Sequence, residues 1–193
     1  MKKISNKKYK SILAISRELF WKHGFRRITI QEICDKAGVS KMTFYKYFPN
    51  KTELAKTVFS NEVQDGLVKF NELMEEEIPA DEKIQKMILY KAESTKNISR
   101  EFLEDFYLGT EPELKEFVEQ LTKDAWYNLR RDWERAQQNG IFRNDFKPDF
   151  LLHVSFSLVE LMKNEKLAQL YNTPQELILE FTRFIAYGIS PRS

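Results

Sequence analysis

The sequence has little of the residues that make tight turns or crosslinks. Among its 193 residues are only 6 Gly, 6 Pro and 1 Cys. Because an all-β chain of this length needs many turns, the shortage of turn formers favours a helical fold. The lone thiol, Cys34, cannot form an intrachain disulfide or a cysteine-built zinc site, and it is typical of a reducing compartment. We therefore expect a helical, cytoplasmic protein.

Long hydrophobic runs are also missing. The longest early apolar run, Ile12–Ile15, is too short for the core of a signal peptide. The most apolar later stretch, Phe150–Met162, includes Glu160 and falls short of a membrane span. Hydrophobic residues at 42% and charged residues at 31% fit a folded globular chain rather than a disordered one. We expect neither secretion nor membrane insertion.

Groupings typical of catalysis or metal binding are scarce as well. The two histidines, His23 and His153, are far apart in the sequence. No Ser/His/Asp or Cys/His grouping, glycine-rich phosphate loop or metal-ligand spacing stands out. The sequence therefore predicts no enzyme, no metal site and no cofactor.

What the sequence does have is an uneven distribution of charge. Residues 1–55 contain 13 Lys and Arg against 4 Asp and Glu, whereas residues 56–193 contain 18 against 25. A basic head on an acidic body is typical of a nucleic-acid-binding module attached to a second part. A basic solvated surface without a partner has the same composition, so the local pattern has to decide.

The basic head predicts three short helices. Gly24 stands where the C-terminal cap of the first helix belongs. Thr29, with Glu32 three residues later, forms a capping box that opens the second helix, which ends at Gly38. Ser40 can then cap the third helix. The three predicted helices span about residues 7–22, 30–37 and 41–47.

The second and third helices have the arrangement of a DNA-binding helix-turn-helix, because a short turn containing glycine joins them. Phe44 and Phe48, at positions i and i+4, predict the buried side of the third helix. Lysines on the other side can neutralise phosphates, hydroxyls can donate to phosphate oxygens, and Met or Tyr can meet a thymine methyl. The predicted exposed residues of this recognition helix are Lys41, Met42, Thr43, Tyr45, Lys46 and Tyr47.

The rest of the chain predicts further helices bounded by prolines and glycines, with no convincing strand or repeat. The fold class is therefore all-α, with a three-helix N-terminal helix-turn-helix DNA-binding domain over residues 1–50 and a six-helix C-terminal domain over residues 51–193. The six predicted helices span about residues 51–77, 81–96, 100–108, 112–140, 148–163 and 174–188.

A family resemblance covers nearly the whole of the first 55 residues, at several fixed offsets. It lies in Ile12-Leu13-Ala14, Leu19-Phe20, His23-Gly24-Phe25 and the run ITIQEICDKAGVSKMTFYKYFPNKTEL over residues 28–54. This pattern resembles the N-terminal domain of the TetR (tetracycline-repressor) family. The resemblance implies a homodimeric transcriptional regulator, usually a repressor that a small ligand releases from its operator.

The resemblance also assigns roles to single positions. Thr29 resembles the phosphate-contacting cap of the second helix, and Gln31 the base-reaching position beside it. Lys51 resembles a lysine whose ammonium, together with a helix N-terminus, attracts a phosphate. Lys41, Met42 and Tyr45 match positions near base edges, whereas Thr43, Lys46 and Tyr47 match positions that hold the backbone. The complete predicted DNA-binding set is Thr29, Gln31, Ser40, Lys41, Met42, Thr43, Tyr45, Lys46, Tyr47 and Lys51.

Two positions depart from the family pattern. Met42 stands where the family more often has Gly or Pro, which affects how closely the third helix approaches the groove. Cys34 stands where a small buried residue, commonly Ala, is expected. We interpret Cys34 as a packing residue rather than a redox sensor.

The C-terminal domain is predicted to bind a ligand and to form a dimer. The helices at about 148–163 and 174–188 are apolar on more than one face, so each must be buried on two sides, and the resemblance implies a homodimer interface there. For an apolar or aromatic effector we select Tyr107, Trp126 and His153, because each pairs ring surface with a polar group. Aromatic residues at helical spacing also form cores, and that alternative stays open. The alternative function is a helical protein-interaction module with a non-specific basic head.

Overall fold

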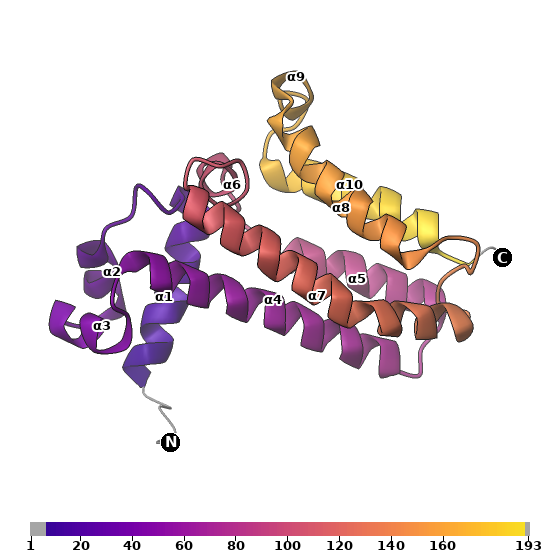
Figure 1. Cartoon of the computed structure of the whole chain (residues 1–193), viewed down its shortest axis with the longest axis horizontal. Helices are drawn as coiled ribbons and strands as arrows, with labels where there is room; N and C mark the ends of the chain where they lie inside the picture. The colour runs from indigo at the N-terminus through magenta and orange to yellow at the C-terminus, as the bar shows by residue number, and fades with distance from the viewer. Residues whose placement is uncertain (1–6, 192–193) are drawn as a thin grey trace. The chain divides into compact units, whose positions relative to one another are not determined.

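The computed structural model describes residues 7–191, which form ten α-helices and no strand (Figure 1). All nine predicted helices are present with ends within two residues of the prediction, so the all-α fold is confirmed. The structure adds one single-turn helix, α9, which the sequence analysis did not predict. Among the described residues, no helix has both the length and the hydropathy needed to cross a membrane. The helices are α1 (Lys7–His23), α2 (Ile30–Ala37), α3 (Lys41–Tyr47), α4 (Lys51–Glu75), α5 (Ala80–Ser94), α6 (Arg100–Phe106), α7 (Pro112–Gln138), α8 (Pro148–Lys163), α9 (Glu165–Ala168) and α10 (Pro174–Ile189).

The helices pack as two compact units. The first unit contains the described residues up to Asn61 together with Asn97–Glu119, and the second contains Glu62–Lys96 and the described residues from Gln120 onward. Helices α4 and α7 each contribute residues to both units. The packing thus joins α6 and the start of α4 to the three helices of the predicted DNA-binding domain. The functional boundary after residue 50 stays a prediction, because a packing unit need not be a functional domain.

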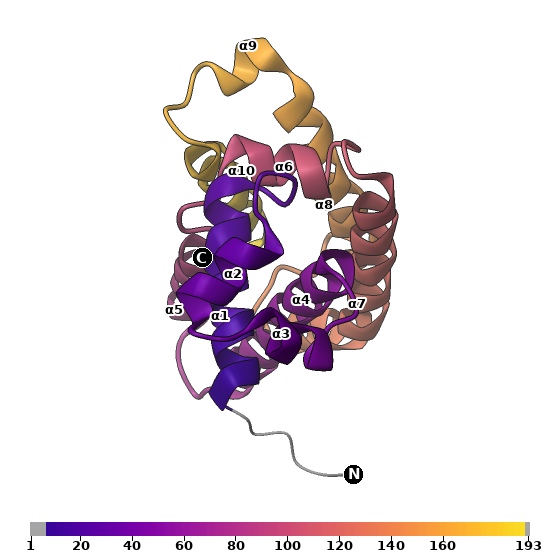
Figure 2. The same cartoon turned by 90° about the vertical axis from the view of Figure 1, so that its left-hand side faces the viewer.

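The first unit is held together by aromatic side chains between α1 and α6. Phe20, Phe102 and Phe106 are each at most 1% exposed. The rings of Phe102 and Phe106 stack with centroids 4.5 Å apart, and the Trp21 ring lies 4.4 Å from Phe102. The backbone N–H of Ser99 donates to the Trp21 carbonyl at 2.8 Å. These contacts attach α6 to the last turn of α1, while α2 packs across α1 (Figure 2).

The second unit has its own core, in which α10 packs against both α5 and α8. Trp133 of α7 stacks on Phe142 with ring centroids 4.7 Å apart and on Phe70 at 5.2 Å. Burying aromatic rings of this size removes a large apolar area from water. One cluster of buried core residues consists of Ile84, Ile88, Trp133, Ala136, Ile141, Phe142, Leu151, Ala186 and Ile189.

A buried lysine binds the carbonyl groups at the C-terminal end of α4, in the second unit. The last carbonyl groups of an α-helix have no partner within the helix. Lys83 is 3% exposed, and its ammonium donates to the carbonyl oxygens of Leu73, Met74 and Glu76 at 2.7, 2.8 and 2.6 Å. Burial lowers the pKa of Lys83. The ammonium thus satisfies carbonyl groups that would otherwise be left without a hydrogen bond.

Candidate nucleic-acid interface

The two helices of the helix-turn-helix begin at the predicted N-cap residues. The Thr29 side chain accepts from the Glu32 N–H at 3.1 Å, and the Ser40 side chain accepts from the Thr43 N–H at 3.2 Å. Gly38 has a φ of +66°, which lets the chain leave α2 at once. The N-caps predicted at Thr29 and Ser40 are therefore confirmed, and they fix where α2 and α3 begin.

Helix α3 has one buried and one exposed face. Phe44 and Phe48 are 0% and 3% exposed, as the i, i+4 spacing predicts. Met42 and Tyr45 are 83% and 54% exposed, and Lys46 is exposed as well. Apolar side chains left in water beside lysines form a surface that suits a groove lined by bases and phosphates.

The ten residues predicted to bind DNA all lie in the first unit, but not all are open to solvent. The Gln31 amide donates to the Asp35 carboxylate at 2.6 Å. The Tyr47 ring packs edge-on against Tyr9 with centroids 5.5 Å apart. Such contacts reduce the number of rotamers that these side chains can use. Seven of the ten are exposed (Thr29, Gln31, Ser40, Lys41, Met42, Tyr45 and Lys46), and three are partly buried (Thr43, Tyr47 and Lys51).

Lys51, at the start of α4, contacts protein carbonyl groups. Its ammonium donates to the carbonyl oxygens of Phe25 at 2.8 Å and Ile28 at 2.7 Å, and it lies 3.5 Å from that of Arg26. It also lies 4.1 Å from the centroid of the Phe25 ring. Burial lowers the pKa of Lys51, and the nearby acids Glu111 and Asp105 act in the opposite direction. The phosphate contact of Lys51 stays a prediction, while the structure gives this residue a second role that the sequence analysis missed.

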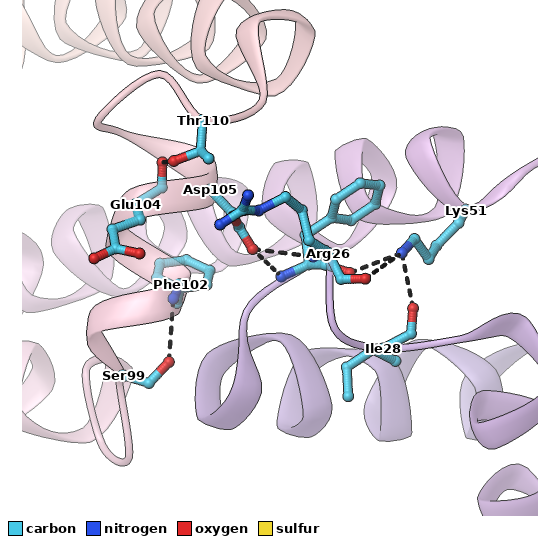
Figure 3. A network of polar contacts seen from close by, with 9 residues as sticks. Arg26, Ile28, Lys51, Ser99, Phe102, Glu104, Asp105 and Thr110 are labelled. Atoms are coloured by element: carbon cyan, nitrogen blue, oxygen red, sulfur yellow. Dashed lines mark hydrogen bonds and ion pairs between the residues drawn. The ribbon is translucent and has the colours of Figure 1, made fainter.

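Asp105 of α6 contacts the same loop between α1 and α2 (Figure 3). Its carboxylate is 2% exposed. One oxygen accepts from the backbone N–H groups of Phe25 at 2.7 Å and Arg26 at 3.0 Å, and the other accepts from Arg26 Nε at 2.8 Å. Sequence reasoning missed this residue, although an acid beside Phe106, on the helix that also carries Phe102, is a signal that a buried partner exists.

The structure does not bring the three predicted ligand-binding residues into one unit. Tyr107 belongs to the first unit and is partly buried, and burial raises its pKa. Trp126 and His153 belong to the second unit, where Trp126 stacks on Trp133 with centroids 5.9 Å apart and His153 is exposed. Their role stays a prediction. A separate recess of about 500 Å³ is lined by Asn71, Met74, Glu75, Asp132, Arg135, Ala136, Asn139 and Ile141, none of which we predicted to bind a ligand.

Helices α8 and α10, predicted to form the dimer interface, leave large apolar side chains in water. Phe150 of α8 is 62% exposed, and Phe184 and Tyr187 of α10 are 78% and 55% exposed. The two helices pack against each other within the second unit. Exposed apolar side chains on adjacent helices are typical of a protein contact surface.

Sequence comparison relates this chain to bacterial transcriptional regulators. Residues 12–58 match the profile of the bacterial regulatory proteins of the TetR family. A Bacillus subtilis (strain 168) protein described as the uncharacterized HTH-type transcriptional regulator YdgC is 24% identical over 195 residues. That alignment covers 95% of this chain and 93% of YdgC.

Solved structures share the fold over nearly the whole chain. The fatty acid degradation regulator FadR from Bacillus halodurans gives a TM-score of 0.68 at 18% identity, covering 98% of this chain and 100% of its own. FadR from Bacillus subtilis in complex with stearoyl-CoA gives 0.64 at 18%, covering 94% and 99%. A TetR-family regulator from Agrobacterium tumefaciens gives 0.66 at 19%, covering 96% and 100%. At these identities the structures establish the fold alone. The family match over residues 12–58 and the relative along the full length support a transcriptional regulator of the TetR family.

Proposed function

We propose that the protein is a repressor that binds a near-palindromic operator as a homodimer and is released by an apolar or aromatic small molecule. The observation that supports this most strongly is the exposed face of α3, where Met42 and Tyr45 stand in solvent next to lysines. Lysines supply attraction to phosphates, and the apolar and hydroxyl groups supply contacts to base edges. The basic charge of residues 1–55 extends this attraction over the whole first part of the chain.

The exposed apolar residues of α8 and α10 support the homodimer. Two copies joined there would carry two α3 helices, one for each half-site. A near-palindrome is read when the two recognition helices are about 34–36 Å apart, which is one turn of B-DNA. An effector that prefers another separation lowers operator affinity only by its differential affinity for the two conformations.

The aromatic core of the second unit supports an effector with a large apolar part and a hydrogen-bond acceptor. Trp133 is 6% exposed, and within the described part of the chain its indole N–H has no hydrogen-bond partner. A buried donor without a partner costs about 1–3 kcal/mol, which a carbonyl or carboxylate of a ligand can recover. The similarity to FadR in complex with stearoyl-CoA makes long-chain acyl compounds the first class to test.

The proposal is tested by selecting DNA from a randomised pool with the wild-type protein. We expect enrichment of an inverted repeat, whose affinity exceeds that of a scrambled duplex and falls steeply with salt. Equal and weak binding to both duplexes would contradict sequence-specific recognition and favour the protein-interaction module with a non-specific basic head. Release of the selected DNA by acyl-CoA, with loss of that release in Trp133→Phe, then tests the effector.

A further inference from the structure

The loop between α1 and α2, residues 24–29, passes unusually close to α6. Gly24 has a φ of +77°, a region that favours glycine. A Cβ atom at Gly24 would lie 2.7 Å from the Asp105 carboxylate and 2.9 Å from Glu101 Cβ. Real Cβ atoms do not make contacts that short, so the sequence leaves room for the loop to approach Asp105.

Two side chains of opposite charge form hydrogen bonds to the backbone of this loop. The acid accepts from N–H groups, and the lysine donates to carbonyl groups. The Asp105 carboxylate accepts from N–H groups of Phe25 and Arg26, and the Lys51 ammonium donates to carbonyl groups of Phe25 and Ile28 (Figure 3). Hydrogen bonds to charged groups are shorter and about twice as strong as those between neutral groups. Because both sets of bonds go to backbone atoms, they fix the path of the chain rather than one side chain.

The path of the loop decides where α2 begins. The side chains of Phe25 and Ile28 on either side of the held backbone are 6% and 2% exposed. The next residue, Thr29, is the N-cap of α2. Helix α2 packs on α3, so a shift at Thr29 moves the surface that carries the predicted DNA contacts.

We propose that Asp105 and Lys51 are positioning residues for operator recognition. They hold the α1–α2 loop from both sides and thereby place the N-terminus of α2 and the recognition helix against DNA. In this role the Lys51 ammonium acts on protein carbonyls rather than on a phosphate. The inference rests on the proposed DNA-binding function and adds a residue of α6 to the determinants of specificity.

The test compares variants of α6 and α4 on the selected operator and on its scrambled duplex. Asp105→Ala removes every acceptor, whereas Asp105→Asn keeps one oxygen for the backbone N–H groups and guards against a variant that does not fold. Glu104→Gln is the matched control, since it removes one negative charge from the same helix and Figure 3 shows its carboxylate turned away from Arg26. Lys51→Met removes the ammonium and keeps an unbranched side chain that is only one atom shorter. Each protein is measured for affinity, for its salt slope and for hydrogen exchange of the Phe25 and Arg26 amides.

We expect Asp105→Ala to expose both amides to fast exchange and to weaken operator binding at least about tenfold, with little change on the scrambled duplex. Asp105→Asn should recover part of both effects, and Glu104→Gln should change neither. Lys51→Met should weaken operator binding with an unchanged salt slope. A merely structural role would weaken both duplexes in proportion to the unfolded fraction.

Three results would overturn the proposal. One is normal operator affinity in Asp105→Ala despite fast exchange of the two amides. Another is an equal loss on both duplexes with a salt slope reduced by about one in Lys51→Met, which is the signature of a phosphate contact. The third is a wild type that selects no DNA sequence. That result contradicts the proposed function itself, and it is distinguished from failure of the loop contacts because the exchange of the Phe25 and Arg26 amides is measured without DNA.

Discussion

Each unit of the molecule contains a lysine whose ammonium faces three backbone carbonyl groups. In the second unit Lys83 contacts two carbonyls in the last turn of α4 and that of Glu76 just after it, and in the first unit Lys51 contacts the carbonyls of the α1–α2 loop. Burial lowers the pKa of both side chains. The Lys83 contacts end a helix, whereas the Lys51 contacts fix the segment that leads into the helix-turn-helix. In our proposal, the same interaction serves stability in one unit and recognition in the other.

The exposed apolar residues of the two units differ in the charge of the chain around them. In the first unit Met42 and Tyr45 stand beside lysines in the basic part of the chain. In the second unit Phe150 and Phe184 stand in the part of the chain where acids outnumber bases. Apolar groups within a basic surface suit a nucleic acid, and apolar groups on an acidic body suit another protein surface.

The largest effect is expected from charging the apolar surface of α8 and α10. Phe150→Glu with Phe184→Glu should convert a dimer into monomers, because carboxylates resist burial in an interface. Operator affinity should fall at least about 100-fold, since each monomer reads only one half-site. Sedimentation velocity and DNA titration measure the two effects.

Leu89→Glu is the matched control for that double variant. Leu89 of α5 is 55% exposed in the same unit, so the substitution adds a negative charge, one against the two of the double variant, at another exposed apolar position. It should leave the oligomeric state unchanged. A double variant that sediments as the wild type would refute the interface.

Substitutions of the two lysines should have different effects: one mainly on the free energy of unfolding, the other on the ratio of operator to scrambled affinity. Lys83→Met leaves carbonyls at the end of α4 without donors and should lower the free energy of unfolding by about 3 kcal/mol, with an unchanged ratio of operator to scrambled affinity. Lys51→Met should lower the free energy of unfolding less, because this side chain is partly exposed, and should lower the affinity ratio. Chemical denaturation and DNA titration of both variants check the contrast. An equal change of the affinity ratio in both variants would abolish the distinction between the units.

A smaller effect is expected from the recognition helix. Tyr45→Ala should weaken operator binding by about 1–3 kcal/mol and leave the fold intact, because Tyr45 is 54% exposed. Tyr127→Ala, which removes a 74% exposed tyrosine of α7, is the control and should bind as the wild type. Unchanged affinity in Tyr45→Ala would contradict its assignment to base contacts.

The smallest effect is expected at Cys34. It is 1% exposed, which agrees with the interpretation of this residue as packing. Burial first, and the neighbouring Asp35 second, raise the pKa of the thiol, so it stays protonated at neutral pH. Alkylation should be at least about 100-fold slower in the folded protein than in denaturant, and peroxide should leave operator binding unchanged. Fast alkylation in the folded state would indicate an accessible, reactive thiol.

The local parts of this structure could be predicted from the sequence. Thr29 and Ser40 cap α2 and α3, and Phe44 and Phe48 are buried, because each of these features depends on residues within one or two helical turns. The single-turn α9 was missed, since four residues give no periodicity.

The contacts that hold the α1–α2 loop could not be predicted from local sequence spacing. Asp105 meets Phe25 across 80 residues and Lys51 meets the same residue across 26, and both use backbone atoms, which leave no trace in composition. Local spacing also could not predict which of the aromatic residues chosen for ligand binding lie in the same unit. Tyr107 and Trp126 both pair ring surface with a polar group, yet they belong to different units.

The most direct test is the hydrogen exchange of the whole protein with and without the selected operator. DNA should slow exchange in α3, over Lys41–Tyr47, and at the N-terminus of α2 around Thr29 and Gln31. Protection confined to segments outside the helix-turn-helix, such as α8 and α10, would contradict the assignment of this surface to DNA.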